Sequence, residues 1–172
     1  LGPQDWFADT RGKGMRAQRR LARKTRSLRG AYVTYAPQAA SSALNPGRTV
    51  GRQLQLAIAR RDTPPASVPQ EIRRILDAVG LPAGASSALA GELSGGMAQR
   101  AALAVAVAPA PKVMIADEPE TGLDPVLTRQ IIELMIRVAR HEGCGMLLIS
   151  HHQETVDRVA GQVVHLPGGG LG

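Results

Sequence analysis

The sequence predicts an α/β fold whose sheet is mainly parallel. Short apolar segments such as Lys112–Asp117 alternate along the chain with longer segments whose apolar residues recur at helical spacing. Residues that cap helices, and glycines and prolines that end them, separate the two kinds of segment. The chain has 172 residues, of which 44% are hydrophobic, so it can bury one core; that core must be aliphatic because aromatic residues make up only 2%.

Strands are predicted where a short apolar segment runs into a turn or a charge. The segment Ala31–Ala36 reads AYVTYA, which is rich in β-branched and aromatic residues, and Pro37 ends it. The run VMIADE consists of apolar residues up to two carboxylates, which is typical of a buried strand. The predicted strands are 31–36, 112–117, 145–150 and 162–166.

Most of the predicted helices follow a side chain that can accept a hydrogen bond from the first turn. Glycine or proline follows their predicted ends, as at Gly80, Pro109 and Gly143. Two less regular helices are expected in the basic segment 11–29 and between the last two strands. Three capped helices are expected from Thr49 to about Arg60, from Ser67 (with Gln70 in a capping box) to about Val79, and from Ser94 to about Ala108. A fourth is expected to begin at Pro125, with Asp124 as its N-cap.

Charge and composition limit the classes of partner. The formal net charge is +7, but residues 11–29 hold nine Lys or Arg and no acid, which leaves −2 on the remainder. Nucleic acid could bind such a segment, but it lacks interleaved aromatic residues, so we expect a solvated face and no nucleic-acid partner. The longest apolar stretch, Ala101–Ala110, is too short to cross a bilayer, so membrane association would be peripheral. Cys144 is expected to be a buried, unreactive thiol.

The segment Leu93–Arg100, which reads LSGGMAQR, is a candidate phosphate site. Ser94 at a helix N-terminus, followed by Gly95 and Gly96, would leave backbone N–H groups open to an anion. The positive end of the helix dipole would favour the same ligand.

Two carboxylates, Asp117 and Glu118, stand at the end of a predicted strand, where α/β proteins bind ligands. Adjacent strand residues point to opposite sides, so one acid can hold Mg²⁺ while the other faces a water molecule. The alternative is that Asp117-Glu118-Pro119 only ends the strand and begins a turn. His151 follows the next strand along the chain and could contact a phosphoryl oxygen, or it could be an ordinary surface histidine.

The order of these motifs resembles the ATP-binding cassette (ABC) ATPases over about residues 30–166. The motifs are LSGGMAQR, VMIADEP, TGLD at 121–124 and ISH at 149–151. The resemblance implies a P-loop NTPase core with a mainly parallel sheet at about 30–38 and 109–167. It also implies a helical subdomain at about 39–108, within a single domain, 1–172, that binds ATP and Mg²⁺.

The resemblance assigns roles to individual residues. Glu118 would be the catalytic carboxylate, and His151 would contact the γ-phosphate. Asp117 would hold Mg²⁺, with Gln38 of the Q-loop sensing the metal and the attacking water. In ABC dimers each ATP lies between the P-loop of one subunit and the signature motif of the other, so a second ABC ATPase subunit, identical or different, is implied. The residues that would contact nucleotide are Gln38, Ser94, Gly95, Gly96, Gln99 and Asp124.

The segment Pro37–Leu54 is similar to the Q-loop region of oligopeptide, dipeptide and nickel importers. This implies the ATP-hydrolysing subunit of an importer for a small solute. It would act with transmembrane permease subunits, on the inner, cytoplasmic face of the cell membrane. Three alternatives stay open: a non-transport ABC ATPase acting on DNA or ribosomes, a phosphonate-processing ABC-like protein, and a non-catalytic partner subunit.

One motif of the family does not occur in these residues. A P-loop has the pattern G-x-x-x-x-G-K-[ST], and Gly12-Lys13-Gly14 is followed by Met15 instead. In the family the P-loop precedes the Q-loop by several dozen residues. We therefore expect an N-terminally truncated chain, without the first strands and the P-loop, that has little ATPase activity alone. A natural protein without a P-loop is the alternative.

Overall fold

The computed structural model describes residue 15 and residues 30–36, 43–119 and 125–164, and at their centre lies a parallel sheet. Its strands are β1 (Val33–Ala36), β2 (Val113–Asp117) and β3 (Gly145–Ile149), in the order β1-β2-β3. The register places Val33 opposite Val113 and Val113 opposite Gly145. The carboxyl ends of the three strands therefore lie at one edge of the sheet, and the predicted α/β class is confirmed.

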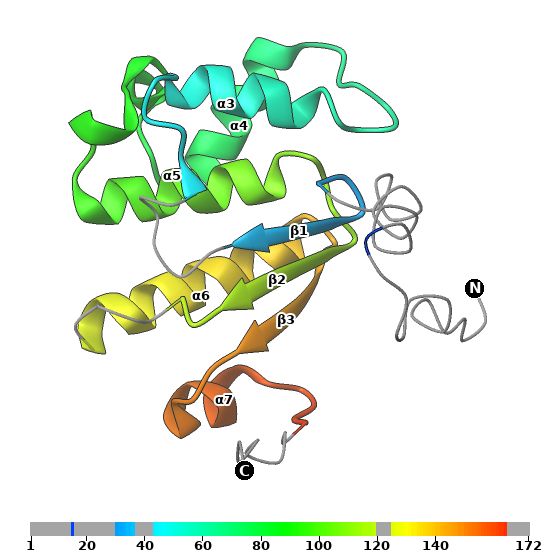
Figure 1. Cartoon of the computed structure of the whole chain (residues 1–172), viewed down its shortest axis with the longest axis vertical. Helices are drawn as coiled ribbons and strands as arrows, with labels where there is room; N and C mark the ends of the chain where they lie inside the picture. The colour runs from blue at the N-terminus through cyan, green and yellow to red at the C-terminus, as the bar shows by residue number, and fades with distance from the viewer. Residues whose placement is uncertain (1–14, 16–29, 37–42, 120–124, 165–172) are drawn as a thin grey trace.

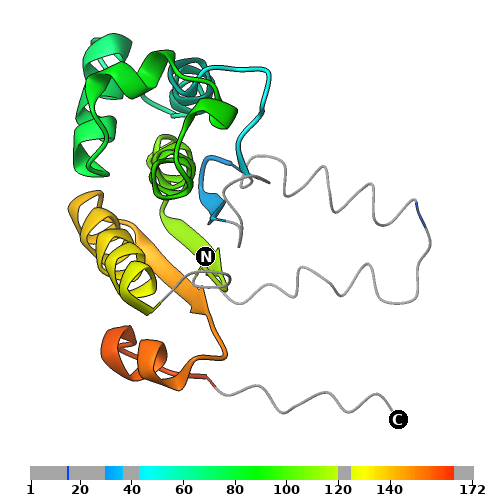
Figure 2. The same cartoon turned by 90° about the vertical axis from the view of Figure 1, so that its left-hand side faces the viewer.

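Two helices, α5 (Gly95–Val107) and α6 (Pro125–His141), cover one face of this sheet (Figure 2). α5 contacts β1, α6 contacts β3, and the two helices contact each other. Met114 and Ala116 of β2, which face them, are fully buried. α5 presents mainly alanines to this interface, so it can lie close to the sheet with few large side chains.

A second layer of helices lies on the side of α5 away from β2 and β3 (Figure 1). It contains α3 (Val50–Ile58) and α4 (Val68–Ala78), with short 3-10 helices at Ala83–Ser87 (η1) and Ala90–Glu92 (η2). Both α3 and α4 contact α5. Aliphatic side chains hold this layer together, and the fully buried ones include Val50, Leu54, Ile58, Ile75 and Leu76.

Three predicted helix N-caps are confirmed. The hydroxyl of Thr49 accepts a hydrogen bond from the backbone N–H of Arg52 at 3.3 Å. The hydroxyls of Ser67 and Ser94 accept from the residues three positions ahead, at 3.5 and 3.3 Å. Each bond satisfies an N–H group that the helix itself leaves without a partner, so these three helices begin where the local sequence predicts.

The C-terminal region differs from the prediction. A short helix, α7 (Gln153–Val159), follows β3 as expected, but the predicted strand at 162–166 is wrong over its described residues, 162–164, which form no strand. Val163 and Val164 are exposed there. Apolar residues form a strand only against a neighbouring strand, and none of the described strands pairs with this segment. The predicted basic helix at 11–29 lies outside the described residues, apart from Met15.

Within the ranges that the structure describes, no helix combines the length and apolar character needed to cross a bilayer. Cys144 is buried, as predicted, and burial raises the pKa of its thiol.

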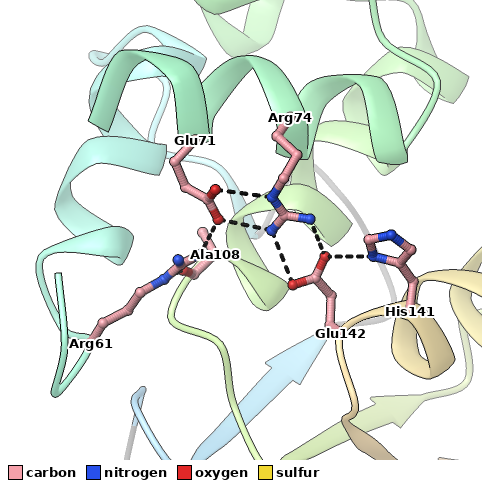
Figure 3. Close-up of polar contacts among 6 residues, drawn as sticks. All are labelled: Arg61, Glu71, Arg74, Ala108, His141 and Glu142. Atoms are coloured by element: carbon pink, nitrogen blue, oxygen red, sulfur yellow. Dashed lines mark hydrogen bonds and ion pairs between the residues drawn. The ribbon is translucent and has the colours of Figure 1, made fainter. Parts of the chain in front are cut away.

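Ion pairs join the helical layer to the end of α6 (Figure 3). The guanidinium of Arg74, on α4, bonds to Glu71 on the same helix and to Glu142, which follows α6. We call this group the Arg74 cluster; its members are Arg61, Glu71, Arg74, His141 and Glu142.

Candidate functional site

Three candidate site residues lie at the carboxyl ends of β2 and β3. Asp117 is the last residue of β2 and pairs with Ile149 of β3, and Glu118 and His151 lie just beyond these strands. Nδ1 of His151 is 3.0 Å from Oε1 of Glu118. The structure thus brings together Glu118 and His151, which are 33 positions apart. We call Asp117, Glu118 and His151 the acidic edge.

The backbone of Glu118 is in the left-handed region, with φ of 42°. Its N–H donates to the carbonyl of Ile149 at 2.8 Å, so the sheet ladder continues one residue past Asp117. A non-glycine residue in this conformation carries strain of about 1–3 kcal/mol, and such residues cluster at functional sites. The strain shows that the surrounding sheet fixes this glutamate in place.

Asp117 has a partner that the sequence pattern does not reveal. The hydroxyl of Tyr35, on β1, donates to Oδ2 of Asp117 at 2.9 Å, and this bond raises the pKa of Tyr35. Tyr35 pairs with Ile115, two residues before Asp117, so both side chains stand on the same face of the sheet. Strand alternation alone could have suggested the face, but the pairing of β1 with β2 was needed to bring the two side chains together.

The Ser94 turn has the form of an anion site. Ser94, Gly95 and Gly96 are exposed, and the space where a Cβ would stand on either glycine has no neighbour within 4 Å. Backbone N–H groups in the first turn of a 13-residue helix are therefore accessible to a phosphate. α5 begins on the side of the molecule at which the strands end (Figure 1).

Gln99, the seventh residue of the LSGGMAQR motif, lies near the residue that follows the acidic edge. Its side chain, one helical turn into α5, lines a small hollow together with Pro119, which follows Glu118, and with Ala36 at the end of β1. α5 therefore lies close to the residue that follows the acidic edge.

The last residue of the LSGGMAQR motif supports the fold. Arg100 donates from its guanidinium to the carbonyl of Val79 at 2.9 Å, at the C-terminal end of α4. Gly80 beside it has φ of 71°, and a Cβ there would stand 2.7 Å from the Arg100 guanidinium. The contact ties α5 to α4, and the sequence reasoning did not predict it.

Two predicted site residues, Gln38 and Asp124, lie outside the described residues, and their roles stay predictions. The acidic edge fits a magnesium ion, because Asp117 offers hard carboxylate oxygens and Tyr35 orients one of them. Among the described residues no group of three or more His, Cys, Asp or Glu could hold a metal. Mg²⁺ is commonly bound by one or two carboxylates together with phosphate oxygens and water, so a smaller donor set suffices.

Comparison with known proteins gives a family. A sequence profile of the ABC transporter family matches residues 7–121. The dipeptide transport ATP-binding protein DppD of Escherichia coli is 36% identical over 154 residues, which are 88% of this chain and 47% of that protein. The oligopeptide transport ATP-binding protein OppD of Lactococcus lactis is 34% identical, over 84% of this chain and 44% of that protein. The methionine import ATP-binding protein MetN 3 of Pectobacterium atrosepticum is 38% identical, over 72% and 36%. The chain thus spans about half the length, or less, of these relatives.

Solved structures share the fold. The chain superposes on cbiO1 from Clostridium perfringens, part of the ABC transporter complex cbiONQ, with a TM-score of 0.63 and 22% identity, over 78% of this chain and 51% of that one. It superposes equally well on the ATP-binding cassette MJ0796 bound to ADP and Pi, with a TM-score of 0.63 and 20% identity, over 77% and 58%. The described sheet and helices therefore have the fold of ABC ATPases.

Proposed function

The chain belongs to the ABC transporter family, and on this premise we propose that it forms part of the ATP-binding subunit of an importer. The acidic edge would serve ATP hydrolysis, and the Ser94 turn would bind a nucleotide phosphate. The contact between Glu118 and His151, next to a strained backbone at Glu118, is the observation that carries the proposal. It combines a fixed carboxylate with a group that can reach a phosphoryl oxygen.

Each residue of the acidic edge has a distinct part in this proposal. Glu118 orients the attacking water and accepts its proton, while His151 holds Glu118 and donates to the γ-phosphate. Asp117, positioned by Tyr35, would hold Mg²⁺, and the metal when bound neutralises charge on the phosphates. Ser94, Gly95 and Gly96 offer N–H groups and a helix N-terminus to a phosphate.

We propose that the nucleotide is shared between two ATPase subunits. The 172 residues contain no P-loop pattern, so most of the phosphate contacts expected in this family are absent from them. The Ser94 turn would therefore cover a nucleotide that is held by the P-loop of a second subunit, and the isolated 172-residue chain would bind Mg-ATP weakly. Gln38 and Asp124 are also proposed to contact nucleotide. Residues 39–108 are proposed to form the subdomain that binds the permease.

The proposed cargo is a peptide or a similarly small solute. DppD and OppD are named for dipeptide and oligopeptide transport, MetN 3 for methionine import, and the segment Pro37–Leu54 is similar to the peptide and nickel group. These names favour import over an ABC ATPase that acts on DNA or ribosomes. Such a subunit would bind permease subunits at the cytoplasmic face of the membrane.

The decisive experiment measures ATP hydrolysis by the complete subunit that contains these residues, reconstituted with its permease. Asp117→Asn and Glu118→Gln should each lower turnover about 100-fold or more, because a metal ligand or the water-orienting carboxylate is lost. Glu133→Gln, on the exposed face of α6, is the matched control and should leave turnover unchanged. Near-normal turnover in Glu118→Gln would remove Glu118 from the mechanism and overturn the proposal.

A further inference from the structure

The Arg74 cluster joins two parts of the molecule that no strand pairing connects. We propose that Arg74 is a positioning residue that fixes the orientation of the helical layer, α3 and α4, relative to α6. The consequence for the Ser94 turn rests on the proposed function, whereas the positioning role of Arg74 rests on its contacts alone.

Arg74 bonds to two carboxylates through both sides of its planar guanidinium (Figure 3). Toward Glu142, Nη1 is 2.6 Å from Oε1 and Nη2 is 3.1 Å from Oε2. Toward Glu71, Nε is 2.9 Å from Oε2 and Nη2 is 2.8 Å from Oε1. Two bidentate contacts restrict the orientation of the guanidinium as well as its distance from the carboxylates, whereas a single ion pair restricts only the distance.

The cluster also reaches α5. The guanidinium of Arg61, which follows α3, donates to Glu71 at 2.7 Å and to the carbonyl of Ala108, at the end of α5, also at 2.7 Å. Glu71 therefore accepts from two arginines, and the ends of α3, α5 and α6 are all tied to α4. His141 adds a contact of 3.2 Å to Glu142.

The position of the Arg74 cluster, at the far ends of α5 and α6, allows it to influence the geometry of the candidate site. α6 has 17 residues and is about 26 Å long. It begins beyond the acidic edge and ends at the cluster, while α5 begins at the Ser94 turn and also ends at the cluster. Between their ends these two helices also contact each other. A change of angle at Arg74 would therefore move the Ser94 turn relative to the acidic edge.

The test measures the distance between the two parts in the 172-residue chain without nucleotide. Spin labels are placed at Asp77→Cys on α4 and Arg137→Cys on α6, both exposed positions, in a Cys144→Ala background. With native Arg74 the distance distribution should be narrow, and Arg74→Met should broaden it about twofold by releasing the two parts. Arg74→Lys should restore only part of the order, because an ammonium cannot make two bidentate contacts.

The control is Arg129→Met, which removes an exposed ion pair with Glu133 on α6 and should leave the distribution unchanged. If Arg74→Met does not fold, Glu142→Gln carries the test, since it keeps the side-chain shape and removes the charge that links the two parts. An unchanged distribution in a folded Arg74→Met or Glu142→Gln variant overturns the inference. Because no nucleotide is present, this result is independent of whether Glu118→Gln slows ATP hydrolysis.

Discussion

Two pairs of carboxylates in this chain have opposite environments. In the Arg74 cluster the side chains of Glu71 and Glu142 are 13% and 10% exposed, and both bond to the guanidinium of Arg74, with His141 as a further partner of Glu142. At the acidic edge the side chain of Glu118 is 35% exposed, and the described partners of Asp117 and Glu118 are a phenol and an imidazole. A guanidinium carries a permanent charge and stabilises a partly buried carboxylate, whereas a phenol or an imidazole can orient a carboxylate that also faces solvent.

The comparison separates structural acids from candidate functional ones. An acid that is largely removed from water is stabilised by pairing, and removal of its cation leaves its charge less well compensated. At Glu118, by contrast, the strained backbone lowers local stability while the neighbouring strand fixes the position of the residue. Substitutions should therefore have opposite effects on stability in the two places, and the effects below run from the largest to the smallest.

Arg74→Met should give the largest loss, about 2–3 kcal/mol in the free energy of unfolding, because Glu71 and Glu142 lose their shared cation. Urea denaturation followed by circular dichroism measures it. Arg129→Met, which breaks an exposed pair, should cost less than about 0.5 kcal/mol. Equal losses in the two variants would show that the cluster is an ordinary surface network.

Acid should weaken the cluster next. The Arg74 and Arg61 guanidinium groups lower the pKa of Glu71 from 4.5 to about 2. This stabilisation is complete above the unfolded-state value of 4.5 and disappears as the pH falls toward 2. The chain should lose about 1–2 kcal/mol over this range, after allowance for solvent screening. The loss should be smaller in Glu71→Gln, and an equal loss in both proteins would assign the effect to other groups.

Glu118→Gly should have a smaller effect and the opposite sign. Glycine adopts φ of 42° without steric cost, so relief of strain should offset the lost contact with His151 and raise stability by up to about 0.5 kcal/mol. Thermal unfolding against the native chain measures the difference. A clear destabilisation would mean that Glu118 supports the fold, as Glu71 and Glu142 do, and would remove the contrast between the two pairs of acids.

Tyr35→Phe should be the mildest change. The phenol is exposed on the open face of β1, so loss of its hydroxyl should leave the unfolding midpoint unchanged within error. The mobility of the Asp117 side chain should rise, which side-chain carboxyl relaxation in nuclear magnetic resonance can detect. Unchanged mobility would show that Tyr35 does not orient Asp117.

Local features of the fold could be predicted from the sequence. Thr49, Ser67 and Ser94 cap helices because an N-cap bond spans only three residues, and β2 and β3 lie within one residue of their predicted bounds. The strand predicted at 162–166 is wrong over its described residues, 162–164, because a strand needs a partner, which a local apolar pattern cannot supply. β1 begins two residues late, since Gly30 and Val33 close a turn before it.

The residues of the candidate site could be predicted from the sequence, whereas most of the contacts between them could not. Glu118 and His151 both follow apolar strands, so their meeting follows from parallel pairing of those strands. The bond from Tyr35 to Asp117 joins residues 82 positions apart, and the bond from Arg74 to Glu142 joins residues 68 apart. Such contacts depend on the register and on how the helices pack, and neither is encoded in a local pattern. The left-handed backbone of Glu118 likewise has no signal in its residue type.

Glu118 is proposed to act in ATP hydrolysis, whereas Glu71 stabilises the fold. The most direct test compares Glu118→Gln and Glu71→Gln in the complete ATP-binding subunit, by single-turnover ATP hydrolysis per folded molecule and by the free energy of unfolding. We predict that Glu118→Gln loses about 100-fold in turnover at native stability, while Glu71→Gln loses stability and lowers turnover far less than Glu118→Gln does. Native turnover in Glu118→Gln would contradict the account.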